Sequence, residues 1–236
     1  MVEGKLALQA LLSSPYPLVS VLVLRRRLAV LADLDVPAGA QVFVAGDETM
    51  KSITGFDVHR GLLALARRLP ARDATELLAT GLSSPLVVVE TVSDQENLGA
   101  IFRNAAAFGA GAVFLGPTCA DPLYRRSIRV SQGAVLKLPF ATLAPWPQSL
   151  ELLRNKGFLP LALTPGTDAE PISRVAKGLH GRNVALVVGA EGPGLSPEVL
   201  STCRRVRIPI APGVDSLNVA AATAVALHEF AGLRLS

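Results

Sequence analysis

The second half of the chain alternates short apolar runs with helix-like segments, and this alternation constrains the fold more than any other feature. Continuous apolar strands separated by helices are typical of a parallel sheet with both faces covered by helices. The sequence therefore predicts an α/β fold, with strands at residues 86–90, 112–115, 158–163, 184–188 and 207–210 and helices at residues 98–108, 123–131 and from Leu217 to about Leu233.

The first half of the chain shows a shorter version of the same alternation. Residues 72–84 then become less apolar and end in Ser83-Ser84-Pro85, a composition typical of a linker. We therefore predict a small α/β domain over residues 1–83 and a parallel-sheet domain over residues 84–236. The strands expected in the small domain are residues 18–23, 42–45 and 61–66, and the expected helices are residues 5–13, 26–32 and 47–55.

Composition and charge narrow the class of protein. The 236 residues are 50% hydrophobic and 18% charged, which favours packed structure over disorder. The net charge of +4 permits a polyanionic partner without requiring one. Cys119 and Cys203 form no C-x-x-C pair, and no His/Cys/carboxylate cluster has metal-ligand spacing. The early apolar stretch at residues 18–24 is too short to span a bilayer. We expect a soluble cytoplasmic protein with no metal and no membrane partner.

Three segments of the second half place polar residues or glycines after a predicted strand, where open α/β sheets bind their ligands. The first segment is residues 97–107, NLGAIFRNAAA. Asn97 is a candidate N-cap. Arg103 interrupts a helix of Ala, Ile, Phe and Gly, where a charge is either solvated or held by a specific anionic partner.

The second segment, residues 189–196, follows the predicted strand at 184–188 and surrounds Glu191 with three glycines. Glycines leave the backbone open to close approach by a ligand, although a purely structural turn is the alternative. The segment is neither a phosphate-binding P-loop nor the dinucleotide fingerprint G-x-G-x-x-G.

The third segment, residues 207–220, ends in Ser216-Leu217-Asn218 at the start of a very apolar helix. Asp215 or Ser216 is a candidate N-cap for this helix. Either choice leaves Asn218 as a polar residue in the first turn, where it needs a partner.

In this order, the three segments resemble the three motifs of the SpoU/TrmH branch of the SPOUT RNA 2′-O-ribose methyltransferases. The resemblance covers residue 86 to about residue 233 and includes residues 121–134, between the first two motifs. Residues 54–64 resemble, more loosely, the ribosomal-protein-like substrate-binding domain of many members. The resemblance implies a deep trefoil knot in the C-terminal domain, S-adenosylmethionine as the cofactor, and a homodimer formed through the catalytic domain.

The resemblance also assigns roles to individual residues. The catalytic and positioning residues would be Asn97, Arg103, Glu191, Ser216 and Asn218. The residues holding S-adenosylmethionine would be Gly189, Gly192, Ile208, Leu217 and Asn218. The family's proposed base is the arginine at position 103, but a guanidinium with a pKa above about 12 is better suited to gripping a phosphate.

RNA contacts are expected from arginines outside the three motifs, with ordinary solvated charge as the alternative. They are Arg60, Arg125, Arg126 and Arg129. The globular first half favours ribosomal RNA over transfer RNA as substrate, because family members specific for transfer RNA often carry helical extensions instead.

Two other functions compete with the RNA methyltransferase. A catalytically silent RNA-binding protein of the same fold is disfavoured because Arg103, Glu191, Ser216 and Asn218 are all present. A nucleotide-binding oxidoreductase with an ordinary doubly wound sheet is disfavoured because no G-x-G-x-x-G follows any predicted strand.

Overall fold

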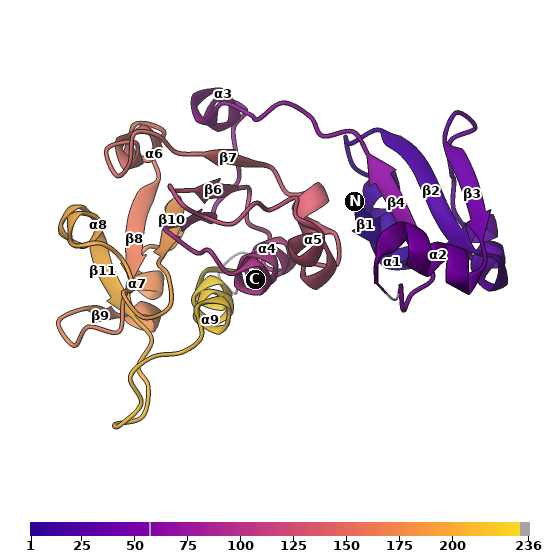
Figure 1. Cartoon of the computed structure of the whole chain (residues 1–236). Helices are drawn as coiled ribbons and strands as arrows, with labels where there is room; N and C mark the ends of the chain where they lie inside the picture. The colour runs from indigo at the N-terminus through magenta and orange to yellow at the C-terminus, as the bar shows by residue number, and fades with distance from the viewer. Residues whose placement is uncertain (57, 232–236) are drawn as a thin grey trace.

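The computed structural model describes residues 1–56 and 58–231 and contains two β-sheets in this part of the chain (Figure 1). The small sheet has the strand order β1-β4-β2-β3, and the large sheet has the order β7-β6-β5-β10-β8-β11-β9. The small sheet is built from the N-terminal part of the chain and lies to one side of the large sheet in Figure 1.

The small sheet is mixed. Strands β2 and β3 pair in parallel, whereas β4 is antiparallel to both β1 and β2. The elements of this unit are β1 (Val2–Glu3), α1 (Lys5–Leu12), β2 (Leu18–Leu24), a 3-10 helix (Arg25–Asp33), β3 (Gln41–Ala45), α2 (Asp47–Thr54) and β4 (Leu62–Ala66). Gly55 ends α2 in the left-handed conformation (φ 73°), which glycine adopts without steric cost.

Every strand pair of the large sheet is parallel, which confirms the predicted α/β class. The strands are β5 (Leu86–Val89), β6 (Val113–Leu115), β7 (Phe140–Thr142), β8 (Leu159–Leu163), β9 (Glu170–Pro171), β10 (Val184–Val188) and β11 (Arg204–Arg207). The helices are α3 (Ala74–Ala79), α4 (Gln95–Ala107), α5 (Arg125–Val130), a 3-10 helix (Ala134–Leu136), α6 (Leu150–Asn155), α7 (Ile172–Gly178), α8 (Pro197–Thr202) and α9 (Val219–Ala231). None of the helices in the described ranges has the length and apolar character that crossing a bilayer requires.

Alternate residues of the central strands serve two separate cores, one on each face of the large sheet. Val87 and Val89 of β5 pack with α4, α5, α7 and α9, whereas Leu86 and Val88 pack with α3, α6 and α8. Every residue of β5 and β10 is buried. Full burial of one valine or leucine side chain contributes about 1.5–3 kcal/mol, so these two strands give the site a rigid base.

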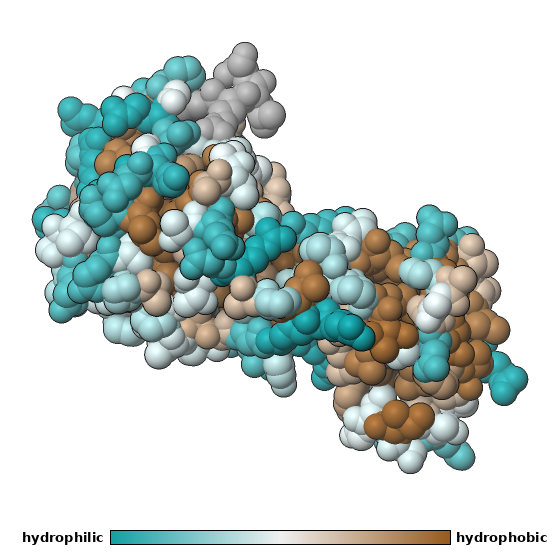
Figure 2. Space-filling model, turned by 90° about the horizontal axis from the view of Figure 1, so that it is seen from above, coloured by the Kyte–Doolittle hydropathy of each residue, from teal (hydrophilic) through white to brown (hydrophobic). Residues whose placement is uncertain are grey.

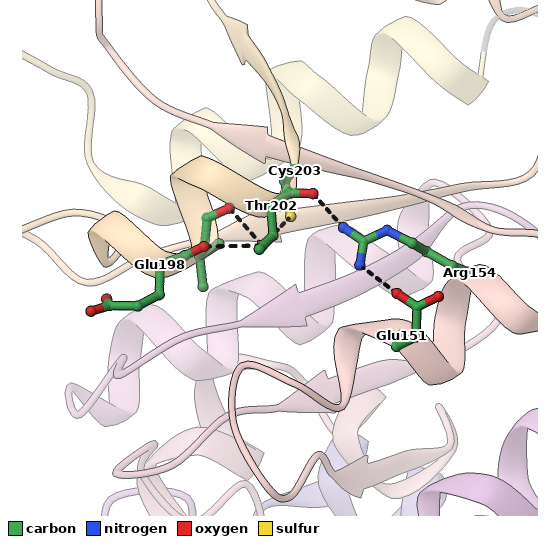
Figure 3. A network of polar contacts seen from close by, with 6 residues as sticks. Glu151, Arg154, Glu198, Thr202 and Cys203 are labelled. Carbon is green, nitrogen blue, oxygen red and sulfur yellow. Dashed lines mark hydrogen bonds and ion pairs between the residues drawn. The ribbon is translucent and has the colours of Figure 1, made fainter.

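On the face covered by α6 and α8, polar contacts tie these two helices together (Figure 3). Arg154 of α6 donates to Glu151 Oε2 at 3.0 Å and to the carbonyl oxygen of Thr202 at the end of α8. The Thr202 hydroxyl donates back within α8 to the carbonyl oxygens of Glu198 and Val199. Arg154 thus satisfies a carbonyl that the helix end leaves free, just before β11 enters the sheet.

The two sheets meet across a shared apolar core. Leu8 of α1 lies in the same buried cluster as Ile128 of α5 and Val135 of the second 3-10 helix. A Cβ on Gly133 would lie 2.3 Å from the Cβ of Ala10, so the backbones of the two units approach closely at this point. The end of the small sheet that lies away from this shared core is exposed to solvent. Four of the five residues of β3 are exposed, and apolar residues show at this end of the molecule on the right of Figure 2.

The structure differs from the sequence prediction at several element boundaries. The segment predicted as a linker contains α3, which packs into the core of the large sheet. The strand expected at residues 207–210 is instead β11, which lies between β8 and β9. Two of its arginines form ion pairs, Arg204 with Glu170 and Arg205 with Asp168. The segment expected as a helix at 26–32 is a 3-10 helix. Asp57 and the predicted helix end near Leu233 lie outside the described residues.

Candidate active site

A cavity of about 270 Å³ opens at the carboxyl ends of β8, β10 and β11. This is the edge at which parallel α/β sheets bind their ligands. The wall is largely apolar side chain and glycine backbone, with a few polar groups. The lining residues are Leu163, Thr164, Pro165, Val188, Gly189, Ala190, Glu191, Gly192, Gly194, Ile208, Ile210, Asp215, Ser216, Leu217, Val219 and Ala222.

One wall of this cavity is a tight turn after β10. The amide of Gly194 donates to the carbonyl oxygen of Ala190 at 3.1 Å, which folds residues 190–194 back on themselves. A Cβ on Gly189 would lie 2.5 Å from the carbonyl carbon and oxygen of Gly194. Gly192 has a φ of 84°, a conformation that favours glycine. At Gly189 and Gly192, therefore, the turn depends on glycine itself.

Asn218 links the second and third segments to the first. Its Nδ2 donates to Asn97 Oδ1 at 2.9 Å and to Glu191 Oε1 at 2.6 Å. Its Oδ1 accepts from the amides of Ala220 and Ala221, the N-capping arrangement at the start of α9. Three of the predicted catalytic residues thus meet through one amide side chain, which lies next to the cavity residues Leu217 and Val219.

The helix caps differ from the two that the sequence predicts. Asp94 caps α4, because its side chain accepts from the amide of Asn97. Asn218, not Asp215 or Ser216, caps α9. Asp215 and Ser216 instead line the cavity, in the exposed loop of residues 211–218.

Arg103 stands apart from this arrangement. It lies on α4 six residues after Asn97, its side chain is exposed, and it makes no hydrogen bond or ion pair with any residue in 1–56 or 58–231. The next residue, Asn104, donates from Nδ2 to the carbonyl oxygen of Ala220 at 2.8 Å and so holds α4 against α9. The fold therefore fixes the helix that carries Arg103 and leaves its guanidinium available to a ligand.

Sequence reasoning missed Glu90, a buried carboxylate at the end of β5 that is only 3% exposed. It accepts hydrogen bonds from the Ser196 amide at 2.8 Å, the Ser196 hydroxyl at 2.7 Å and Trp146 Nε1 at 2.7 Å. Ser196 follows the glycine turn and caps α8. Glu90 therefore anchors the end of the turn that forms the cavity wall. A charged residue directly after four buried apolar residues was the available signal.

The predicted RNA-contacting arginines occupy different environments. Arg125 Nη1 donates to the buried Glu3 at 3.2 Å, and its guanidinium lies 4.1 Å from the ring centroid of Phe56, so it holds the two units together. Arg126 pairs with the exposed Glu96. Arg60 packs beside Gly4, and Arg129 is exposed with no side-chain partner among the described residues.

Neither cysteine supplies a nucleophile in this structure. Burial raises the pKa of the Cys119 thiol, which donates to the carbonyl oxygen of Val89. Burial likewise raises the pKa of Cys203. Both therefore stay protonated and unreactive near neutral pH. Within residues 1–56 and 58–231, no group of three or more His, Cys, Asp or Glu side chains is placed to hold a metal ion.

A family model described as the SpoU rRNA Methylase family matches residues 84–228. Over 228 residues the chain is 43% identical to an uncharacterized tRNA/rRNA methyltransferase of Mycobacterium bovis, a match that covers 96% of this chain and 78% of the relative. It is 32% identical to the 23S rRNA (guanosine-2′-O-)-methyltransferase RlmB of Ralstonia nicotianae, with 81% of this chain and 77% of the relative covered.

A solved structure supports the same relationship. The AdoMet-bound rRNA methyltransferase from Sinorhizobium meliloti is similar with a TM-score of 0.81 at 26% identity, covering 99% of this chain and 87% of that one. The matched residues include all three segments that form the cavity and its rim. The chain belongs to the SpoU rRNA methylase family.

Proposed function

We propose that this protein is an S-adenosylmethionine-dependent RNA 2′-O-ribose methyltransferase. The observation that carries the proposal is the joining of Asn97, Glu191 and Asn218 beside a glycine-walled cavity. These residues come from three separate segments of the chain. Their convergence places a ligand pocket at one edge of the sheet. The polar side chains beside this pocket, Asn97, Glu191, Ser216 and Asn218, form what we call the polar rim.

The cavity suits the proposed cofactor in both size and lining. Its volume of about 270 Å³ is close to the lower end of the range for small-molecule sites. The backbone at Gly189, Gly192 and Leu217 offers donors and acceptors for an adenosine group, while Ile208 and Val188 offer apolar contact. S-adenosylmethionine, when bound, supplies an electrophilic methyl group on a sulfonium sulfur. The protein must then orient the RNA hydroxyl that accepts this methyl group.

The polar rim would orient that hydroxyl. Asn97, Asn218 and Ser216 have hydrogen-bonding groups suited to a ribose, and Glu191 fixes the amide of Asn218. Arg103 would bind the phosphate beside the ribose. It would also stabilise the negative charge that develops on the 2′-oxygen as the hydroxyl gives its proton to water. Positioning of this kind supplies much of the rate enhancement when no covalent intermediate is formed.

The finer features of the family follow as part of the same proposal. The chain from β8 to α9 would form a deep trefoil knot, and two copies would associate through the catalytic part. Arg103 has no side-chain partner among the residues that the structure describes, and this favours association, because a second copy would bring further groups to the site. The RNA-binding unit would occupy residues 1–83, although the packing of α3 on the large sheet favours a boundary closer to Asp73.

Ribosomal RNA is the proposed substrate, and the cytoplasm is the proposed place of action. The 32% identity to RlmB favours ribosomal RNA. Arg60, Arg126 and Arg129 are the proposed phosphate contacts outside the polar rim. Arg125 contributes through its bond to Glu3, which holds the RNA-binding unit in place.

A methyl-transfer assay tests the proposal. Purified protein is incubated with S-adenosylmethionine that carries a labelled methyl group and with ribosomal RNA from a strain lacking the gene. The RNA is then digested to nucleosides and separated by mass. We expect label in 2′-O-methyl nucleosides. Label in base-methylated nucleosides only, or no label despite measured cofactor binding, would contradict the proposal.

A further inference from the structure

A second cavity, of about 150 Å³, lies where the chain passes from the small sheet to the large one. We infer that it binds one nucleotide of the RNA, with the phosphate on Arg72 and Lys137 and the base against the apolar wall. This inference rests on the proposed RNA substrate. The lining residues are Pro15, Tyr16, Arg68, Leu69, Pro70, Ala71, Arg72, Asp121, Leu123, Leu136, Lys137, Leu138, Pro139 and Phe140.

The charges around this cavity leave an excess of positive charge. Both oxygens of Asp121 are occupied, because Oδ2 accepts from Arg68 at 2.6 Å and Oδ1 accepts from the amide of Leu123 at 2.9 Å. Arg68 and Asp121 therefore neutralise each other. Arg72 and Lys137 are exposed, and their side chains have no hydrogen bond or ion pair with any residue that the structure describes. The cavity thus has two uncompensated cations.

Tyr16 adds a polar group to the cavity lining, close to Arg72 and Arg68. Burial raises the pKa of its hydroxyl, and the nearby Arg72 and Arg68 act in the opposite direction. The hydroxyl therefore stays protonated at neutral pH and can donate to a phosphate oxygen. Two cations and a neutral donor suit a phosphodiester, which spreads one negative charge over two oxygens.

The rest of the cavity is apolar. Its apolar lining comes from two segments, with Leu69 and Pro70 in one and Leu138, Pro139 and Phe140 in the other. The cavity is well below the size of typical sites for drug-sized ligands, so it suits a single base and not a complete cofactor. An acidic peptide would use the cations but has no flat group for the wall. This combination favours a nucleotide.

The position of the cavity separates its role from that of the active site. Residues 136–140 lead into β7 at one edge of the large sheet, whereas the first cavity lies at β8, β10 and β11. Because the walls come from both units, RNA held here would contact both. Losing this contact should weaken RNA binding without changing cofactor binding.

Two neutralising variants test the inference, Arg72→Ala and Lys137→Ala. The matched control is Arg67→Ala, because Arg67 is an exposed arginine beside Arg68 that does not line the cavity. The probe is fragmented ribosomal RNA carrying a fluorescein label, measured by fluorescence anisotropy over a series of salt concentrations. Each cavity variant should bind RNA about 5- to 10-fold more weakly, with a salt slope smaller by about one unit. The control should retain both values.

A third variant tests the neutral donor. Tyr16→Ala removes the hydroxyl that would donate to the phosphate, so it should weaken RNA binding several-fold and leave the salt slope unchanged, because it removes no cation. Arg72→Ala and Lys137→Ala proteins that bind RNA like the control would overturn the inference, as would variants that lose affinity for polyglutamate but keep it for RNA. Calorimetric binding of S-adenosylmethionine is measured in parallel. If the wild-type protein binds RNA through this cavity but binds no cofactor, the proposed activity is refuted. The inference of a nucleotide site would still hold in that case.

Discussion

The two sheets of this molecule differ most in how completely they bury their strands. All residues of β5 and β10 in the large sheet are buried, and helices cover both of its faces. In the small sheet, the inner strand β2 has only three buried residues among its seven, and four of the five residues of the edge strand β3 are exposed. The large sheet can therefore hold a ligand site at fixed positions, whereas the small sheet offers surface and depends on its neighbour for part of its core.

The two regions also differ in the contacts that stabilise them. At the edge of the large sheet, backbone turns and amide side chains fix the cavity and its rim. Where the two units meet, one arginine joins a buried carboxylate to an aromatic ring. The first arrangement should respond to mutation by losing cofactor binding, and the second by losing stability.

The largest expected effect comes from Gly189→Ala at the large sheet. Its new Cβ would lie 2.5 Å from the backbone of Gly194, so the turn must move and the cavity wall with it. We expect the affinity for S-adenosylmethionine to fall by about 100-fold, which corresponds to about 2.7 kcal/mol, near the upper end of the usual overpacking cost. Calorimetry measures the change. Gly178→Ala is the control, since a Cβ there meets nothing within 4 Å. Equal affinity in both variants would show that the turn does not form the cofactor site.

The next largest effect should be a loss of stability in Arg125→Ala, where the two units meet. This substitution leaves Glu3, only 5% exposed, without its cation. Removing one partner of a buried pair is strongly destabilising, and the partial exposure of Arg125 reduces the cost to about 2 kcal/mol. Denaturant unfolding gives the free energy. Arg126→Ala should change it by less than about 1 kcal/mol, because the pair with Glu96 is exposed. Similar losses in both would mean that the burial of the carboxylate partner makes no difference to the contribution of these two ion pairs.

A smaller effect is expected from Glu90→Gln behind the cavity wall. Neutralising this carboxylate weakens its bonds to Ser196 and Trp146, and a hydrogen bond to a charged group contributes about 1.5–3 kcal/mol. We expect about tenfold weaker cofactor binding and a change in the fluorescence of Trp146, the single tryptophan of the chain. The exposed Glu151→Gln variant is the control. Altered fluorescence with unchanged cofactor affinity would limit Glu90 to packing.

The smallest effect separates two roles of Asn218. Asn218→Ala removes the cap of α9 and should lower stability by about 1 kcal/mol. Asn218→Ser keeps a capping oxygen but loses the donor to Asn97 and Glu191. The serine variant should recover stability, measured by thermal unfolding, while activity stays low in both. Activity restored by serine would mean that Asn218 serves the helix alone.

The sequence predicted β5, β6, β8 and β10 of the large sheet, because these strands are continuous apolar runs. It did not predict the two short edge strands, β7 and β9. It predicted β11 poorly, since hydrophobicity pointed to Ile208 and Ile210, which line the cavity instead. The strand is built from Arg204 to Arg207. Within it, Arg204 and Arg205 pair with carboxylates more than thirty residues away along the chain. Pairings of this kind depend on tertiary structure and leave no local pattern.

The site was likewise only partly readable from the sequence. The motif order indicated Asn97, Glu191 and Asn218, but not that one amide joins them while capping α9. Glu90 was missed because its place directly after an apolar strand marks it as unusual but does not identify its donors, Ser196 and Trp146, which lie far along the chain. The pairing of Arg125 with the buried Glu3 could not be foreseen either, because it depends on how the two units dock.

Arg103 provides the most direct test of the central claim that the cavity holds the cofactor while a separate arginine acts on the RNA. Arg103→Ala and Arg103→Lys are compared with the wild type by calorimetry with S-adenosylmethionine and by single-turnover methyl transfer at saturating RNA. We predict unchanged cofactor affinity in both variants, because Arg103 does not line the cavity. Methyl transfer should fall by at least about 100-fold in both, since an ammonium cannot reproduce the planar guanidinium. Transfer at near wild-type rates in both variants would contradict the account.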